Sequence, residues 1–315
     1  MRVLVTGANG FLGAALLKQL GMLTGVEARG SIRSKSFTAG TLSELVIVGE
    51  LTNQTLWTAA LNDVDVVVHT AARVHVMNDS SVNALQKFRE INVDATCHLA
   101  EMAALAGVKR FIFISSVKVN GESTEARHPY HADEAPAPKD FYGLSKLEAE
   151  DKLRLISIRS GMELVIIRPP LIYGLGVKAN FALMIRWILS GIPLPLGAIN
   201  NLRSFVSIDN LIDLIQLCLT HPAASGQIFL VSDGEDISTN KLILKLAEAL
   251  DVKCALIPLP LGLVRVAATL FGQRKYIQRL FGSLQVDIEK TRNVLGWSPP
   301  ISLTEGLRRT VFLST

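Results

Sequence analysis

The chain has 315 residues, of which 49% are hydrophobic and 19% are charged. This composition excludes an intrinsically disordered protein, and the length allows one large domain or two lobes around a substantial core. The net charge is +4, but the lysines and arginines are scattered without basic runs or interleaved aromatic residues, so no nucleic-acid partner is expected.

The first half of the chain alternates short apolar, β-branched runs with helical stretches, which is typical of a parallel sheet covered on both faces. The predicted strands are Arg2–Thr6, Glu27–Arg33, Leu45–Val48, Val64–His69, Arg110–Ser115 and Glu163–Arg168. The predicted helices are Gly10–Leu20, Gln54–Ala60, Ala84–Ala106 and Tyr142–Ser160. Residues 1–168 are therefore expected to form a Rossmann-type, doubly wound α/β domain.

The pattern changes after Arg168, where Pro169-Pro170 ends the last predicted strand and further prolines separate shorter elements. Residues 169–315 are expected to form mainly a smaller, substrate-binding lobe over the carboxyl ends of the strands. The apolar runs Ser204–Ile208 and Gln227–Val231 are expected to return to the main sheet, within segments 203–215 and 227–232.

A glycine-rich turn, Thr6-Gly7-Ala-Asn-Gly10-Phe-Leu-Gly13, follows the first predicted strand. Gly7 permits a tight turn, Gly10 lets the backbone approach a pyrophosphate, and Gly13 lets the helix pack on the strand. The helix start offers free N–H groups and a positive dipole end to that anion. Because the turn joins a strand to a helix, we predict a dinucleotide site. Its contacts would be Gly7, Asn9, Gly10, Phe11, Leu12 and Gly13.

The end of the second predicted strand helps to choose between NAD and NADP. An acidic residue there would accept the ribose 2′-hydroxyl of NAD, whereas an arginine suits the 2′-phosphate of NADP. This strand ends in Arg33, with Lys35 nearby and no carboxylate, so the sequence favours NADP. Glu50-Leu51, after the third strand, is expected to lie against the adenine.

Tyr142 and Lys146 lie four residues apart on a predicted helix, so their side chains share one face. A tyrosine with its usual pKa near ~10 is a poor proton carrier at neutral pH, but a neighbouring cation favours the phenolate. Ser115 and Ser116 follow the fifth strand, at the edge where ligands bind in this architecture. These residues together predict proton transfer to or from an alcohol or carbonyl.

Ordered motifs over almost the whole chain resemble the NAD-dependent epimerase/dehydratase family of nucleotide-sugar enzymes, within the extended short-chain dehydrogenase/reductase superfamily. They are the glycine turn, His69-Thr-Ala71-Ala72, Asn92, Ser115-Ser116, Tyr142-Gly-Leu-Ser-Lys146, Arg168-Pro169, Arg203-Ser-Phe-Val-Ser-Ile-Asp209-Asn210 and Asp287-Ile-Glu-Lys290 with Leu295-Gly-Trp297. Their joint occurrence in this order is far more specific than any single motif.

The resemblance implies roles for the matching residues at the reacting carbon. Tyr142 would be the acid/base, while Lys146 would bind the nicotinamide ribose hydroxyls and depress the pKa of Tyr142. Ser116 rather than Ser115 would bind the reacting sugar oxygen, because it lies five residues before Gly121, as in the family.

The resemblance also implies residues that hold the two ligands. Ala71-Ala72 would approach the cofactor by backbone, Asn92 would brace the main chain, and Pro169 would border the nicotinamide beside a structural Arg168. The nucleotide sugar would be bound by Ser116, Lys118, Asn180, Arg203 and Arg279. A guanidinium fork suits the oxygens of its pyrophosphate.

Departures from the family pattern narrow the expected reaction. Related dehydratases carry Asp-Glu directly after the catalytic hydroxyl, where this chain has Val117 and Lys118, so a 4,6-dehydratase is not expected. The string from Ser115 to Glu122 is most similar to bacterial polysaccharide-cluster members: UDP-glucose 4-epimerases, or UDP-4-keto-6-deoxy-N-acetylglucosamine 4-reductases. We therefore predict an NAD(P)-dependent enzyme that acts at C4 of a UDP-sugar in surface-polysaccharide (O-antigen, lipopolysaccharide) synthesis. The surroundings of Arg33 favour the reductase, with a UDP-glucose or UDP-N-acetylglucosamine 4-epimerase as the alternative.

Two further classes share parts of this pattern. A non-catalytic dinucleotide sensor typically loses Tyr142 or Lys146, and this chain keeps both. A reductase of non-nucleotide carbonyls would have no use for Asn180 and Arg203 as pyrophosphate ligands.

The remaining expectations concern location and assembly. Three widely spaced cysteines in no ligand spacing indicate a reducing compartment, and no metal site is expected. Without a signal peptide or a stretch of about 18 uncharged apolar residues, a cytoplasmic protein that does not span a membrane is expected. The apolar region Ala255–Leu284 carries charges and is expected to pack in the core or between subunits rather than on a membrane surface. The family resemblance implies a homodimer through the helices near Ala84–Ala106 and Tyr142–Ser160.

Overall fold

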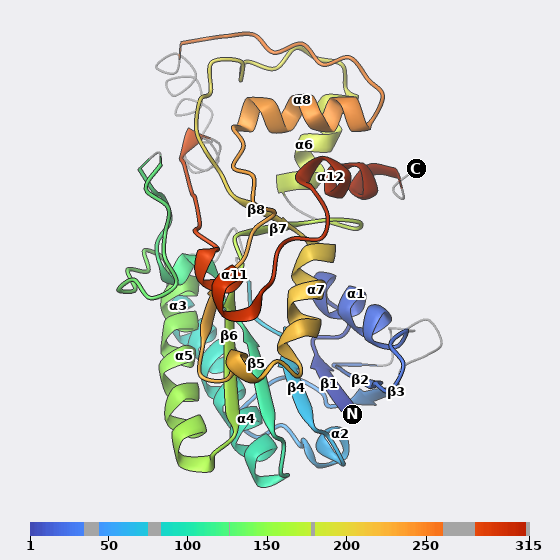
Figure 1. The fold of residues 1–315 in the computed structure, drawn as a ribbon, viewed down its shortest axis with the longest axis vertical. Coiled ribbons are helices and arrows are strands. Elements are labelled where there is room, and N and C mark those ends of the chain that lie inside the picture. Colours follow the sequence, from blue (N-terminus) through green and yellow to red (C-terminus); the bar gives the residue numbers. More distant parts are fainter. Residues whose placement is uncertain (35–43, 75–82, 126, 178–179, 261–280, 313–315) are drawn as a thin grey trace.

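The computed structural model describes residues 1–34, 44–74, 83–125, 127–177, 180–260 and 281–312 (Figure 1). Within these residues, a seven-stranded parallel sheet has the order β3-β2-β1-β4-β5-β6-β9. Its strands are β1 (Arg2–Thr6), β2 (Glu27–Ile32), β3 (Glu44–Ile47), β4 (Val66–His69), β5 (Arg110–Ile114), β6 (Glu163–Arg168) and β9 (Ile228–Leu230). Because the strand order reverses between β1 and β4, a crevice opens there at the carboxyl ends of the strands.

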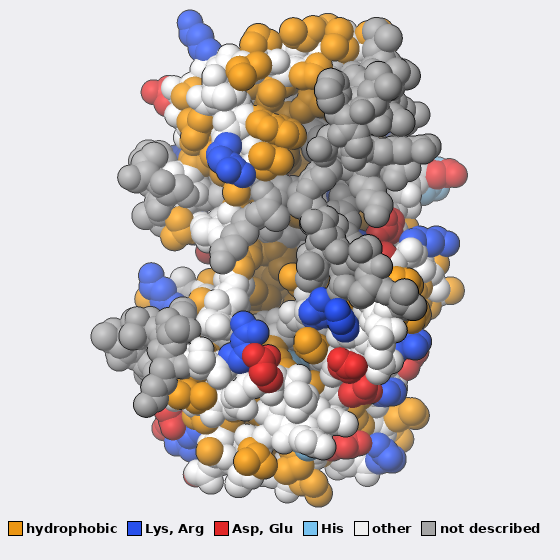
Figure 2. Space-filling model, turned by 180° about the vertical axis from the view of Figure 1, so that it is seen from behind, with side chains coloured by type: hydrophobic (Ala, Val, Ile, Leu, Met, Phe, Trp, Pro, Cys, Tyr) orange, Lys and Arg blue, Asp and Glu red, His pale blue; other side chains and the backbone are white. Residues whose placement is uncertain are grey.

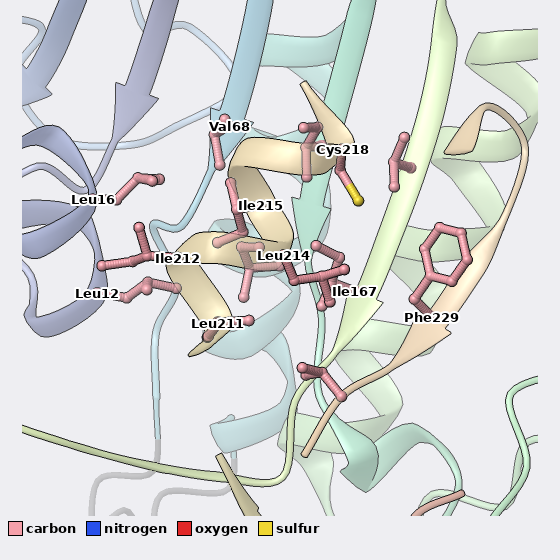
Figure 3. Packing of buried hydrophobic residues seen from close by; sticks show 14 of the residues in the cluster. Leu12, Leu16, Val68, Ile167, Leu211, Ile212, Leu214, Ile215, Cys218 and Phe229 are labelled. Atoms are coloured by element: carbon pink, nitrogen blue, oxygen red, sulfur yellow. The ribbon is translucent and has the colours of Figure 1, made fainter. Parts of the chain in front are cut away.

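Helices α1 (Phe11–Leu20) and α7 (Ile208–Cys218) cover one face of this sheet. Leu16 of α1 and Ile212 and Ile215 of α7 are buried together with Val68 of β4 (Figure 3). Strands buried on both faces need apolar residues at every position. This explains the continuous apolar runs in β1, β4, β5 and β6.

The opposite face is covered by α2 (Thr58–Leu61), α4 (Ala95–Leu105) and α5 (Phe141–Ser160). Two predicted helices differ from those observed. The predicted helix Gln54–Ala60 is reduced to the single turn α2. The predicted helix Ala84–Ala106 is divided into α3 (Ala84–Arg89), a π-helical turn (Glu90–Asp94) and α4.

A smaller unit lies beyond the carboxyl ends of the strands (Figure 1). Its described elements are α6 (Asn180–Leu189), α8 (Thr239–Ala249), α12 (Leu303–Phe312) and a two-stranded parallel sheet of β7 (Leu171–Tyr173) and β8 (Phe205–Ser207). These helices and strands share a separate hydrophobic cluster that includes Tyr173, Phe181 and Leu246.

The expectation that Ser204–Ile208 joins the main sheet is wrong, because β8 pairs with β7 instead. The strand that pairs with β6 at this edge of the main sheet is β9. It comes from the run Gln227–Val231, which we also expected to join the main sheet. After β8, helix α7 does pack on the main sheet, and so does α11 (Glu289–Leu295) through Leu295.

No helix in the described ranges is long and apolar enough to cross a membrane.

Candidate active site

A cleft of about 1780 Å³ lies between the carboxyl edge of the main sheet and the smaller unit. Figure 2 shows this hollow, with hydrophobic side chains inside it. Most of the residues predicted to hold a cofactor line it: Gly7, Asn9, Gly10, Phe11, Leu12, Arg33, Glu50, Leu51, Ala71, Ala72, Tyr142, Lys146 and Pro169. Ser116, Lys118 and Arg203, predicted to bind substrate, line the same cleft.

The glycine turn has the geometry that a dinucleotide requires. Gly7 adopts φ +67°, and a Cβ added there would lie 2.9 Å from the Cα of Ala71. A Cβ on Gly13 would lie 2.2 Å from the carbonyl oxygen of Gly7, so Gly13 brings α1 against the turn without lining the cleft. No side chain caps the start of α1, and Gly10, Phe11 and Leu12 line the cleft. The first N–H groups of a helix without a side-chain cap can bind an anion. These residues fit a bound pyrophosphate.

Arg33 lies just after β2, and its guanidinium is 3.5 Å from the carboxylate of Glu50. Both side chains are more than 60% exposed. An exposed pair of this kind is weak, but Glu50 offsets the positive charge that favoured NADP over NAD.

Asn92 lies behind the cleft and is fully buried. Its side chain accepts a hydrogen bond from the Arg73 N–H (2.8 Å) and donates to the Arg73 carbonyl (3.1 Å) and to the Ser145 hydroxyl (3.0 Å). It thus ties the loop after β4 to helix α5.

Ser115 and Ser116 have different environments. The Ser115 hydroxyl is buried and donates to the Glu150 carboxylate at 2.5 Å. The Ser116 hydroxyl accepts a hydrogen bond from the Lys118 N–H at 3.2 Å, and it lies near enough to the phenol of Tyr142 to lower the pKa of that group. The structure therefore brings Ser116, and not Ser115, to the predicted acid/base.

Burial favours the neutral form of both Tyr142 and Lys146. Burial raises the pKa of Tyr142 and the Asp140 carboxylate raises it further, while the hydrogen bond with Ser116 acts in the opposite direction. Burial lowers the pKa of Lys146 to about 7, and the Glu150 carboxylate opposes this change. The Lys146 ammonium donates to the Ile114 carbonyl at 2.9 Å and lies 4.4 Å from the centre of the Phe113 ring.

Arg168 is structural, as expected, because its guanidinium is buried in an ion pair with Glu150. The shorter of the two contacts is 2.5 Å, and both side chains are at most 1% exposed. Arg168 also donates to the Asn120 side chain at 3.1 Å. This network fixes β6, α5 and the turn after β5 directly behind Ser116.

The predicted substrate ligands are described unevenly. Arg203 lines the cleft, and its guanidinium donates to the Gly282 carbonyl at 3.0 Å. Asn180 begins α6, but its side chain lies outside the described part of the chain, as does the whole of Arg279.

Several cleft residues were missed at the sequence level, among them Asp140, Arg73 and Trp187. Asp140 is the N-cap of α5 and accepts a hydrogen bond from the Gly143 N–H at 2.7 Å. An Asp within two residues of a predicted helix start is an N-cap signal, and it could have identified this residue.

The amino-acid sequence is similar to that of known enzymes. A model described as the NAD dependent epimerase/dehydratase family matches residues 3–232. The chain is 46% identical over 310 residues to a UDP-glucose 4-epimerase of Vibrio cholerae, covering 98% of this chain and 94% of that protein.

Two more distant proteins are also similar to the chain. An N-acetyl-alpha-D-glucosaminyl-diphospho-ditrans,octacis-undecaprenol 4-epimerase of Escherichia coli O157:H7 is 27% identical over 327 residues, with coverages of 98% and 94%. A UDP-glucuronic acid 4-epimerase of Bacillus cereus in complex with NAD shares the fold, with a TM-score of 0.77, 24% identity and coverages of 98% and 97%.

Proposed function

Because the chain belongs to the NAD-dependent epimerase/dehydratase family, we propose that it is a cytoplasmic UDP-hexose 4-epimerase that uses a nicotinamide dinucleotide. The observation that carries the proposal is the meeting of Ser116 and Tyr142 in the cleft that the glycine turn also lines. The similarity to the V. cholerae 4-epimerase over nearly the whole chain supports the same reaction.

Each residue of the site has a role in this reaction. Gly7, Gly10 and the start of α1 would hold a nicotinamide dinucleotide, which would supply reversible hydride transfer at C4. The Tyr142 phenolate takes the proton from the C4 hydroxyl and later gives it back. Ser116 holds the same oxygen, and its hydrogen bond stabilises the phenolate. Arg203, which lines the same cleft, would pair with the pyrophosphate.

The comparisons support epimerisation better than the reduction that the sequence favoured. The preference for a reductase rested on an NADP-binding Arg33, and Glu50 partly neutralises that residue. Val117 and Lys118 stand where a dehydratase would carry its carboxylates, so dehydration is not part of the proposal.

A lipid-linked sugar diphosphate is a second candidate substrate. The E. coli relative is a 4-epimerase of such a compound. Leu171 and Trp187 line the cleft while remaining 41% and 38% exposed, so apolar surface continues outward from the site. Either substrate would suit an enzyme of surface-polysaccharide synthesis.

Product analysis by NMR tests these alternatives. Purified protein with NAD is incubated with UDP-glucose, with UDP-N-acetylglucosamine and with a polyprenyl-diphosphate sugar. We expect the C4 epimer of a UDP-hexose without net cofactor consumption, and about 10²–10⁴-fold slower turnover in Tyr142→Phe with unchanged NAD binding. Stoichiometric oxidation of NADPH with a 4-keto-6-deoxy sugar would identify a reductase instead, and turnover of the lipid-linked sugar alone would identify the second candidate.

A further inference from the structure

Lys118 occupies an unusual position directly beside the proposed catalytic pair. It lies in the 3₁₀ turn Val117–Val119 that follows Ser116. Its side chain is 26% exposed, and its ammonium contacts the carboxylates of Glu122, at 2.8 Å, and Asp140. The Lys118 N–H also donates to the Ser116 hydroxyl.

Asp140 joins this turn to the helix that carries Tyr142. One oxygen of its carboxylate caps α5 by accepting the Gly143 N–H, and the other contacts the Lys118 ammonium. The side chain of Asp140 is 20% exposed, so water screens the pair only partly. Asp140 lies two positions before Tyr142 along the chain.

We infer that Lys118 is a positioning residue, which uses its ion pair with Asp140 to hold Ser116 against Tyr142 and to balance the negative charge beside the phenol. This role differs from the direct substrate binding that the sequence suggested for Lys118. It rests on the proposed function, because it concerns the proton step of that reaction.

The electrostatics agree with this arrangement. Burial favours the neutral acid of Asp140, but the Gly143 N–H and the Lys118 ammonium outweigh it and keep the pKa of Asp140 below its usual value. The carboxylate therefore stays ionised and raises the pKa of Tyr142. An uncompensated charge would raise it more, so the ammonium of Lys118 favours the phenolate.

Most other groups near Tyr142 keep their contacts in the variants described below, whereas Glu122 loses its contact with the ammonium in Lys118→Met. The Phe88 ring meets the phenol edge-on at 6.3 Å, and the Arg73 guanidinium lies over that ring at 5.7 Å. The charged residues described as lining the cleft are Arg33, Glu50, Arg73, Lys118, Glu122, Lys139, Asp140, Lys146 and Arg203.

The test compares the pH dependence of kcat/KM in three variants. In the wild type, kcat/KM for the UDP-hexose should rise with pH as Tyr142 ionises. Lys118→Met should raise the midpoint of this rise by about half a pH unit or more, which corresponds to a roughly threefold lower kcat/KM at pH values below the midpoint. Lys118→Arg keeps the charge and should remain near the wild type. Asp140→Asn keeps a good N-cap while removing the charge, so it should move the midpoint downward.

A second measurement does not depend on turnover. The ultraviolet difference signal of tyrosinate, taken against Tyr142→Phe with NAD bound, reports the ionisation of Tyr142 directly, and the chain has only four tyrosines. The same opposite shifts are expected in Lys118→Met and Asp140→Asn. A wild type without activity on any UDP-hexose would reject the proposed function, yet this titration would still test the inference.

Two outcomes would overturn the inference. One is a raised KM in Lys118→Met with unchanged midpoints in both measurements, which would make Lys118 a substrate ligand. The other is a downward shift of the midpoint in Lys118→Met, because loss of the ammonium should raise the pKa of Tyr142 both by releasing Ser116 and by leaving the Asp140 charge uncompensated.

Discussion

At the scale of single residues, burial acts in opposite directions on the two titratable groups that face each other on α5. It raises the pKa of Tyr142 and lowers that of Lys146, so the surrounding protein favours the neutral form of both. The depression of the Tyr142 pKa by Lys146 stays a prediction. The groups that act in the described structure are Asp140, which raises this pKa, and Ser116, which lowers it.

The buried ammonium of Lys146 should make folding stability depend on pH. Its pKa is about 7 in the folded protein, against about 10.4 in an unfolded chain. Between these values the unfolded chain binds the extra proton, so stability should rise with pH across this window. Urea denaturation at about pH 7 and about pH 9 should show a larger gain for the wild type than for Lys146→Met. Equal gains in both proteins would contradict this prediction.

The sequence predicts some residues of the site better than others. Tyr142 and Lys146 follow from helical spacing, and Ser116 from its place after a strand and before Gly121, because these relations are local. Asp140 was missed because its significance depends on contact with Lys118, 22 residues earlier. Such contacts depend on how a turn packs on a helix, which periodicity does not show.

At the scale of elements, the docking of α5 on the turn after β5 depends on Gly143. A Cβ there would lie 2.6 Å from the Lys118 carbonyl oxygen and 3.2 Å from the Pro138 Cβ. Gly143→Ala should push the helix start away from Ser116, costing about 1–3 kcal/mol of stability and about tenfold or more in kcat. Lys152→Ala, at an exposed position of the same helix, is the control. Urea unfolding and steady-state rates test this, and a fully active Gly143→Ala would be inconsistent with it.

The buried pair of Glu150 and Arg168 should contribute far more than a surface pair on the same helix. Glu150→Gln leaves a guanidinium that is 1% exposed without its counter-charge, a loss expected to cost about 3–5 kcal/mol. The matched control is Glu148→Gln, which breaks the partly exposed 2.6 Å pair with Arg89 and should cost about 0–1 kcal/mol. Thermal and urea unfolding of both variants test the difference. Similar losses would show that Glu150 has no special role.

Element boundaries were predictable where a pattern was long and locally determined. The glycine turn and the strands on either side of it agree with the structure within one or two residues. Ser204–Ile208 has the composition of a strand, but composition does not name its partner. In the structure β8 pairs with β7, and the position beside β6 is occupied by β9.

At the scale of the whole molecule, the change of pattern after Arg168 coincides with the point where the chain leaves β6 for β7 of the smaller unit, and the assignment of the two units to cofactor and substrate stays a prediction. The sequence did not show how much of the second half of the chain packs on the main sheet. Helix α11 packs there through Leu295 because its apolar residues fit the cluster around α7. Nothing in the local sequence distinguishes that cluster from the one in the smaller unit.

Assembly is the last question at this scale, and the outer surfaces of α4 and α5 bear on it. Leu105, Leu155 and Ile158 are 80%, 60% and 80% exposed, and Leu155 and Ile158 lie one turn apart on the same face of α5. Exposed apolar side chains on adjacent helices are typical of a subunit interface. We therefore expect a homodimer in which α4 and α5 pair with their copies.

Sedimentation velocity of the wild type and of Leu155→Arg/Ile158→Arg tests this interface. The wild type should sediment as a dimer at micromolar concentration. The double variant should be a folded monomer, because two buried like charges on each side of a symmetric contact repel and lose their hydration. Leu244→Arg on α8, a residue that is 48% exposed in the smaller unit, should leave the dimer intact. A monomeric wild type, or a double variant that remains dimeric, would remove α4 and α5 from the interface.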